Sequence, residues 1–274
     1  MQISNDLEPN DYQEIQKLLA TLPNKSVDLH QIWQLMDQVW DQIGCDNNNL
    51  DEAKITAFYK HPVWLLNGFL IEQHDLSLQH RHAIADWILQ HPISRVLDFG
   101  GGFGTLARII ANKSDSLKIN IKIDIYEPYP SDFVVSQCSS YHSIDFVISL
   151  NNKYDCLIST DVLEHVPDPL KLFEQMIDSV NLNGYLVIAN CFRPVIKCHL
   201  PMTFHFRYTF KLFAKLMGLK VLGLCEGSHA TIYQKIEKKS INWKIIRLME
   251  NCSRGLYFLF LRPFTAINLS DQKK

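Results

Sequence analysis

The fold is decided by residues 95–107, which read RVLDFGGGFGTLA. An apolar run carrying Asp98 leads into a cluster of glycines, and an amphipathic helical pattern begins directly after them. Gly100, Gly102 and Gly104 permit a tight turn in which backbone N–H groups can approach a ligand that a Cβ would keep away. Because open α/β sheets bind ligands at the carboxyl ends of their strands, we expect a ligand site at this turn.

From residue 95 onward, short apolar runs alternate with helical segments, which is typical of a parallel α/β sheet with helices on both faces. We predict strands at Arg95–Phe99, Asn120–Tyr126, Asp155–Thr160 and Tyr185–Asn190. We predict helices at Thr105–Asn112, from Asp168 to a stop at Asn183-Gly184, and at about 208–217. A closing hairpin would pair Lys220–Cys225 with Thr231–Ile236. Residues 137–153 fit a helix and a weak strand without a clear boundary.

The predicted organisation has three parts. Residues 1–90 have helical spacing and would form a lid and part of a substrate pocket, residues 91–240 the core, and residues 241–274 an extension. In the extension, an amphipathic helix around Trp243 joins the apolar run Leu256–Leu261. That run could be a core strand, a dimer contact or a membrane-surface patch.

The composition is that of a globular protein, with 47% hydrophobic and 20% charged residues. No apolar run approaches the length of a membrane span, and the acidic N-terminus lacks the pattern of a signal peptide. Seven cysteines without a CxxC pair argue against a disulfide framework and a zinc ribbon. We therefore expect a cytoplasmic protein.

Charge is distributed unevenly along the chain. Residues 1–192 hold 12 Lys/Arg and 25 Asp/Glu, whereas residues 193–274 hold 15 and 4. The basic last third is either a solvated face or a surface for peripheral membrane contact. A pI near 6.6 lacks the footprint of a nucleic-acid-binding protein, so nucleic acid is not an expected partner. The oligomeric state is not predicted.

The carboxylate of Asp98 separates two candidate cofactors. Residues 102–107 satisfy G-x-G-x-x-A, a pattern of dinucleotide-binding turns, so an NAD(P)-dependent oxidoreductase is an alternative. A carboxylate in the turn would repel a pyrophosphate and favour a cationic ligand. S-adenosylmethionine carries an ammonium and a sulfonium but no phosphate, and it fits the turn better.

The turn resembles motif I of class I S-adenosylmethionine-dependent methyltransferases, which have a Rossmann-like sheet, and later segments follow in family order. The next predicted strand ends at Glu127, 29 residues after Asp98. Residues 154–169, YDCLISTDVLEHVPDP, are similar to the fourth-strand motif, and residues 180–188 to the turn into strand five. The resemblance covers about residues 92–237. It implies a methyltransferase for a small-molecule acceptor, similar to the ubiquinone-biosynthesis O-methyltransferase branch.

The resemblance also implies roles for particular residues. Asp98, Gly100, Gly102, Gly104, Glu127 and Asp161 would bind the cofactor, with Glu127 accepting hydrogen bonds from the ribose hydroxyls. The adenine contact is not identifiable, and Ser149 and Asn151 are the candidates. A methyltransferase-like protein that binds cofactor but acts only as a partner is a further alternative.

His165 is the candidate catalytic residue, because it follows the fourth predicted strand and a hydroxyl nucleophile needs a base. A capping or packing role is the competing interpretation. Oxygen is the favoured acceptor atom, with nitrogen or carbon open. Asp161, Glu164 and His165 would share one face if their turn were helical, similar to an acidic-His site where a divalent cation could assist. Relatives without metal share the Leu-Glu-His triplet, so we predict no metal.

The remaining histidines have weaker assignments. His199 and His205 follow the fifth predicted strand, either in the acceptor pocket or in an aromatic covering loop. His74, His80 and His82 are expected on the surface of a helix.

Overall fold

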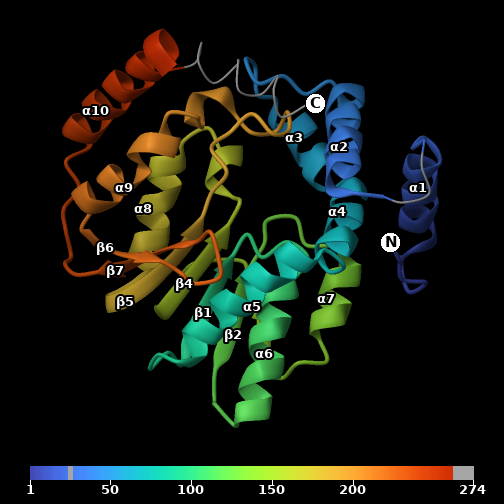
Figure 1. Cartoon of the computed structure of the whole chain (residues 1–274), viewed down its shortest axis with the longest axis horizontal. Coiled ribbons are helices and arrows are strands. Elements are labelled where there is room, and N and C mark those ends of the chain that lie inside the picture. The colour runs from blue at the N-terminus through green and yellow to red at the C-terminus, as the bar shows by residue number, and fades with distance from the viewer. Residues whose placement is uncertain (24–26, 262–274) are drawn as a thin grey trace.

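The core of the computed structural model, which describes residues 1–23 and 27–261, is a seven-stranded sheet in the order β3-β2-β1-β4-β5-β7-β6 (Figure 1). The strands are β1 Arg95–Phe99, β2 Lys122–Tyr126, β3 Ile144–Phe146, β4 Tyr154–Thr160, β5 Val180–Ala189, β6 Leu219–Leu224 and β7 Thr231–Lys235. Strands β1 to β5 pair in parallel, and β7 pairs antiparallel with both β5 and β6. The parallel strands therefore end at one edge, where the predicted ligand turn lies.

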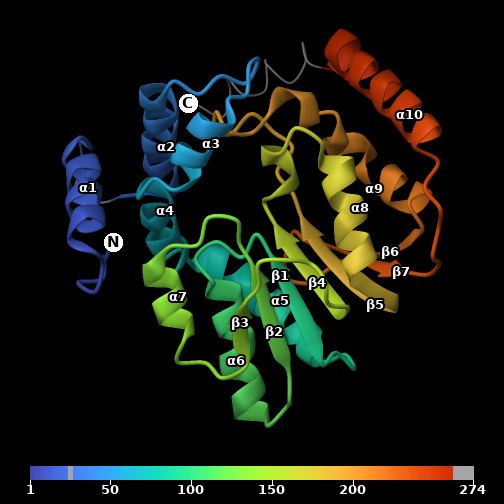
Figure 2. The same cartoon turned by 180° about the vertical axis from the view of Figure 1, so that it is seen from behind.

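Helices cover both faces of this sheet and its carboxyl edge (Figures 1 and 2). They are α1 Pro9–Ala20, α2 Leu29–Ile43, α3 Glu52–Tyr59, α4 Val63–Ile71, α5 Asp75–Leu89, α6 Thr105–Leu117, α7 Asp132–Cys138, α8 Pro169–Ser179, α9 Phe206–Leu216 and α10 Trp243–Leu256, with short turns η1 Leu163–His165, η2 Pro201–Thr203 and η3 Tyr257–Leu261. Side chains alternate along β1, so that Val96 joins the core beneath α6 and Leu97 the core beneath α8 and α9.

The predicted α/β class, the helical N-terminal region and the closing hairpin are confirmed. The ambiguous segment 137–153 contains the end of α7 and the short strand β3. The division at residue 90 stays a prediction. Helix α5, which precedes it, packs along α6 beside the sheet.

The predicted end of the helix after Asp168 is wrong. Helix α8 stops at Ser179, and Val180 already pairs with Tyr154 of β4. Pairing shifts register between Tyr154 and Cys156, and Asn183 takes a left-handed conformation with φ of 65° within β5. The Asn-Gly pair is thus an irregularity inside a strand, where we predicted a helix stop.

The C-terminal extension packs on the core beneath α8 and α9. Ile246 of α10 is buried there, and the Trp243 indole donates a hydrogen bond to Glu174 of α8 at 3.0 Å. The Leu256–Leu261 run ends α10 and continues as the helical turn η3, so the strand alternative is wrong; residues 262–269 lie outside the described residues. In the part of the chain that the structure describes, no helix is long and apolar enough to cross a membrane.

Candidate active site

A cavity of about 1520 Å³ opens at the carboxyl edge of the sheet. Its walls come from the N-terminal helices, the glycine turn, the ends of β1, β2, β4 and β5, and the loop that follows β5. Single-ligand pockets usually span about 300–1,000 Å³, so the space is sufficient for two small molecules.

The glycine turn forms one wall of this cavity. Gly100, Gly102 and Gly104 all have positive φ, of 69°, 52° and 70°. A Cβ at Gly104 would lie 2.8 Å from the Cys138 sulfur, whereas a Cβ at Gly102 would find no atom nearer than 3.9 Å. Gly104 is therefore required by packing, and Gly102 leaves open space over its backbone, as close approach by a ligand needs.

Contacts from α4 hold the turn in place. Phe103 packs against Gly68, where a Cβ would lie 2.1 Å from the Phe103 ring. At the end of α4, Glu72 accepts a hydrogen bond from the Thr105 hydroxyl at 2.9 Å and pairs with Arg108. The first turn of α6 is thereby tied to the N-terminal helices, which fixes the position of the glycines.

Asp98 lies beneath the turn and is only 2% exposed. Within the described residues its Oδ2 atom has no hydrogen-bond partner. Burial raises the pKa of Asp98 to about 7, Glu127 adds to the rise, and the nearby Arg81 guanidinium opposes it. A cationic ligand group would satisfy this carboxylate and favour its ionised form.

Glu127 ends the second strand unit beside the turn. Its oxygens accept hydrogen bonds from the backbone N–H of Gly102 at 3.0 Å and of Tyr129 at 3.1 Å, and burial raises its pKa. A carboxylate has about four acceptor positions, so these contacts orient the group and leave two positions for a diol.

Asp161 lies at the end of β4 on the cavity wall, with a left-handed φ of 55°. Its N–H donates to the Ala189 carbonyl of β5 at 2.8 Å. The condition under which Asp161, Glu164 and His165 would share a helical face is not met, since only Leu163–His165 form a 3₁₀ turn. Asp161 still lies close enough to Glu164 to raise its pKa.

His165 lines the cavity beside aromatic side chains of the N-terminal helices. Its Nδ1 lies 3.1 Å from the Cys198 carbonyl, and its ring packs edge-on against Tyr59, Trp64 and His199. Burial lowers the pKa of His165 to about 3, with a further lowering by His199. So weakly basic an imidazole is poorly matched to general base catalysis at neutral pH.

The other candidate residues are divided between the cavity and the rest of the molecule. His199 is buried on the cavity wall. The loop that carries it lines the cavity, in agreement with the interpretation that placed it in the acceptor pocket. His205 instead joins α9 to α10 through a 2.8 Å contact with the Ser253 hydroxyl. Ser149 and Asn151 are exposed and lie outside the residues that line the cavity, so they are wrong as adenine contacts.

Three predicted surface histidines of α5 have different surroundings. His74 caps the helix by accepting from the Ser77 N–H at 3.3 Å, and His82 is exposed. His80 is partly exposed on the helix, and it also lines the cavity, where its Nδ1 lies 2.9 Å from Nδ1 of His229.

For two features of the site, sequence reasoning named no individual residue. Arg81 of α5 lines the cavity. Burial lowers the pKa of Arg81, and the charges of Asp98 and Asp161 oppose this lowering. Aromatic side chains of the N-terminal helices, Tyr59 and Trp64 among them, form the wall opposite the sheet. Neither feature has a local motif, and only the density of aromatics in 58–87 pointed toward the second.

Comparisons with known proteins bear on this site. A family model described as a methyltransferase domain matches residues 69–220. The chain is similar to the structure of an O-methyltransferase family protein from Burkholderia thailandensis, with 14% identity over 80% of this chain and 74% of that one and a TM-score of 0.51. It is also similar to human N-acetylserotonin methyltransferase, with 16% identity over 76% and 67% and a TM-score of 0.49. No curated protein sequence matches. The first of these structures confirms the predicted Rossmann-like fold.

Proposed function

The chain belongs to the methyltransferase domain family of S-adenosylmethionine-dependent enzymes, and from that premise we propose that it methylates the oxygen of a small, uncharged aromatic molecule. One observation carries the proposal. The glycine turn, Asp98 and Glu127 line the same cavity as the aromatic rings of Tyr59 and Trp64, the half-buried imidazole of His165 and the buried imidazole of His199.

The residues at the turn fit the cofactor. Asp98 presents a buried oxygen without a partner among the described residues, which suits the ammonium of S-adenosylmethionine. Glu127 suits the vicinal ribose hydroxyls, and the open space over Gly102 admits the adenosyl group. When bound, the cofactor supplies an electrophilic methyl group on a positively charged sulfur. The same Asp98 disfavours a dinucleotide, whose pyrophosphate it would repel.

The acceptor end of the cavity supports an uncharged aromatic substrate. Trp33, Tyr59 and Trp64 provide flat apolar surfaces, and His165 and His199 provide hydrogen-bonding groups whose pKa values are lowered by burial. Neutral imidazoles suit a hydroxyl better than an ammonium. The helices α2, α3 and α4 line this end, which favours a small molecule over a macromolecule.

In the proposed reaction, the acceptor oxygen forms a bond to the methyl carbon as the carbon–sulfur bond breaks with its electron pair left on sulfur. The hydroxyl proton passes to water, and S-adenosylhomocysteine is the second product. The contribution of the chain is to hold the two reactants in line, which can account for several kcal/mol of the barrier.

The test offers phenols, anilines and carbon acids of the same ring size as acceptors and measures the methylated products by mass spectrometry. We expect methylated phenols from the wild-type protein. His165→Ala removes a group that positions the acceptor hydroxyl, so it should lower phenol turnover about 10²-fold while S-adenosylhomocysteine affinity stays within about twofold. Methylated anilines without methylated phenols would refute the oxygen assignment. Turnover unchanged in His165→Ala would refute the placement of the acceptor.

A further inference from the structure

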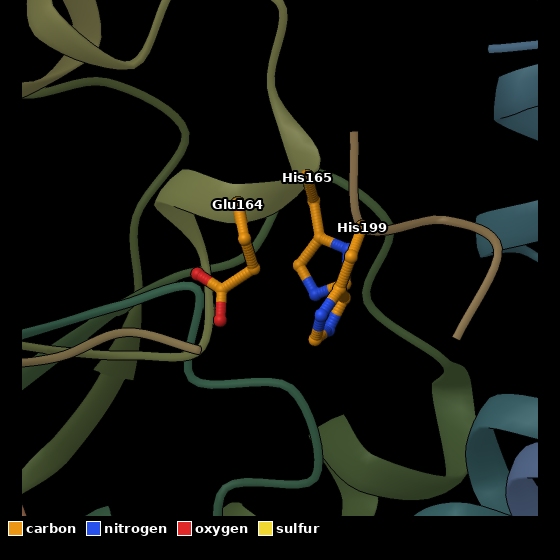
Figure 3. Close-up of side chains that lie close together, drawn as sticks. All are labelled: Glu164, His165 and His199. Carbon is orange, nitrogen blue, oxygen red and sulfur yellow. The ribbon is translucent and has the colours of Figure 1, made fainter. Parts of the chain in front are cut away.

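Glu164, His165 and His199 lie close together beside the cavity (Figure 3). Each offers one ligand atom, and these atoms all lie within 4.8 Å of one another. Glu164 and His165 belong to η1 after β4, whereas His199 comes from the loop after β5, so the sheet brings the two segments together.

The two histidines are held in one tautomer. Nδ1 of His165 lies 3.1 Å from the Cys198 carbonyl, and Nδ1 of His199 lies 2.7 Å from the Arg193 carbonyl. A carbonyl oxygen can only accept, so each Nδ1 carries the hydrogen and each Nε2 keeps a free lone pair. Metal-binding histidines in proteins are oriented in this way by a hydrogen bond from the second ring nitrogen.

Glu164 completes the set with a buried carboxyl group. The residue is 0% exposed, and one oxygen accepts from the Cys191 N–H at 2.5 Å. The other, Oε2, has no hydrogen-bond partner in the described ranges 1–23 and 27–261. A buried polar atom without a partner is costly, and a bound cation would remove that cost.

We propose that Glu164, His165 and His199 bind a divalent transition-metal cation, with the remaining coordination positions open to the cavity. Two imidazoles and one carboxylate suit zinc, iron and manganese, and are poorly matched to calcium. Bonds of about 2.0–2.2 Å place tetrahedral ligand atoms about 3.4 Å apart, so binding draws the most widely separated pair together by at most about 1.4 Å.

The open positions face the end of the cavity assigned to the acceptor, and this part of the inference rests on the proposed function. A hydroxyl that coordinates the cation loses its proton to water more readily, because the cation stabilises the oxyanion. The cation thus supplies the activation for which a free imidazole at His165 is poorly suited. His199, absent from the D-x-x-E-H pattern, takes the place that the pattern gave to Asp161.

The experiment titrates the full-length protein, stripped with a chelator, with Co²⁺ followed by absorption and with Zn²⁺ followed by calorimetry. We expect one equivalent to bind, with the d–d bands of a cobalt site containing nitrogen ligands. His199→Ala and Glu164→Gln should each weaken binding about 100-fold or more. His80→Ala is the matched control, because His80 lines the cavity outside the cluster. This variant should bind the cations as the wild-type protein does.

The inference would be overturned if the wild-type protein bound neither cation, or if wild type and His199→Ala bound the cations equally well. Calorimetry with S-adenosylhomocysteine on the same variants shows whether they are folded and separates this failure from failure of the proposed function. Cobalt bands that do not change when a catechol is added would overturn the role of the cation at the acceptor.

Discussion

Replacing Asp98 by Asn should stabilise the free protein at alkaline pH and weaken cofactor binding. The folded-state pKa of Asp98 is about 7 against an ordinary 3.8. Below the ordinary pKa, the carboxyl group therefore does not reduce the free energy of unfolding. The reduction grows as pH rises from 3.8 to 7. An Asn side chain has no such cost at any pH.

The magnitude follows from the width of this interval. Between pH 5.5 and the folded-state pKa of about 7 lie about 1.5 pH units, at 1.36 kcal/mol each. The free energy of unfolding of Asp98→Asn, relative to wild type, should thus rise by about 2 kcal/mol from pH 5.5 to pH 8. Affinity for S-adenosylhomocysteine should fall about 10–100-fold, as expected for loss of a charged hydrogen-bond partner.

Urea unfolding at the two pH values and calorimetry with S-adenosylhomocysteine measure both effects. Asp145→Asn on β3 is the control, because this carboxylate is exposed and its variant should show neither effect. The reasoning is refuted if the stability difference between Asp98→Asn and wild type is the same at both pH values and the variant binds S-adenosylhomocysteine equally well. That result would assign Asp98 to the architecture of the turn.

Three more variants test the cofactor end of the cavity. Glu127→Ala should weaken S-adenosylhomocysteine binding in calorimetry by about 1–3 kcal/mol, and unchanged affinity would remove the ribose assignment. Arg81→Gln should move the pH midpoint of that binding upward, because Arg81 lowers the pKa of Asp98; an unmoved midpoint would contradict their coupling. Gly68→Ala places a carbon 2.1 Å from the Phe103 ring and should cost about 1–3 kcal/mol in urea unfolding, whereas Gly255→Ala, with open space around it, should cost nothing.

Local pattern was sufficient for the cofactor end of the site. Asp98, the glycines and Glu127 each stand at the end of a predicted strand, and parallel strands end at one edge of a sheet. Their meeting could therefore be predicted without coordinates. The end of α8 could not, because Val180 leaves the helix for a pairing with Tyr154, and long-range pairing overrides local helical pattern.

The contacts at the acceptor end were decided by tertiary structure. His165 and His199 are 34 residues apart and meet because β4 and β5 are neighbours in the sheet, while Tyr59 and Trp64 reach them from separate helices. The sequence by itself determined a strand–turn–helix unit and the acids around it, since these follow from backbone sterics and chain order. It left open which distant side chains line the rest of the cavity, because burial and chain crossing bring them together with no spacing rule that links them.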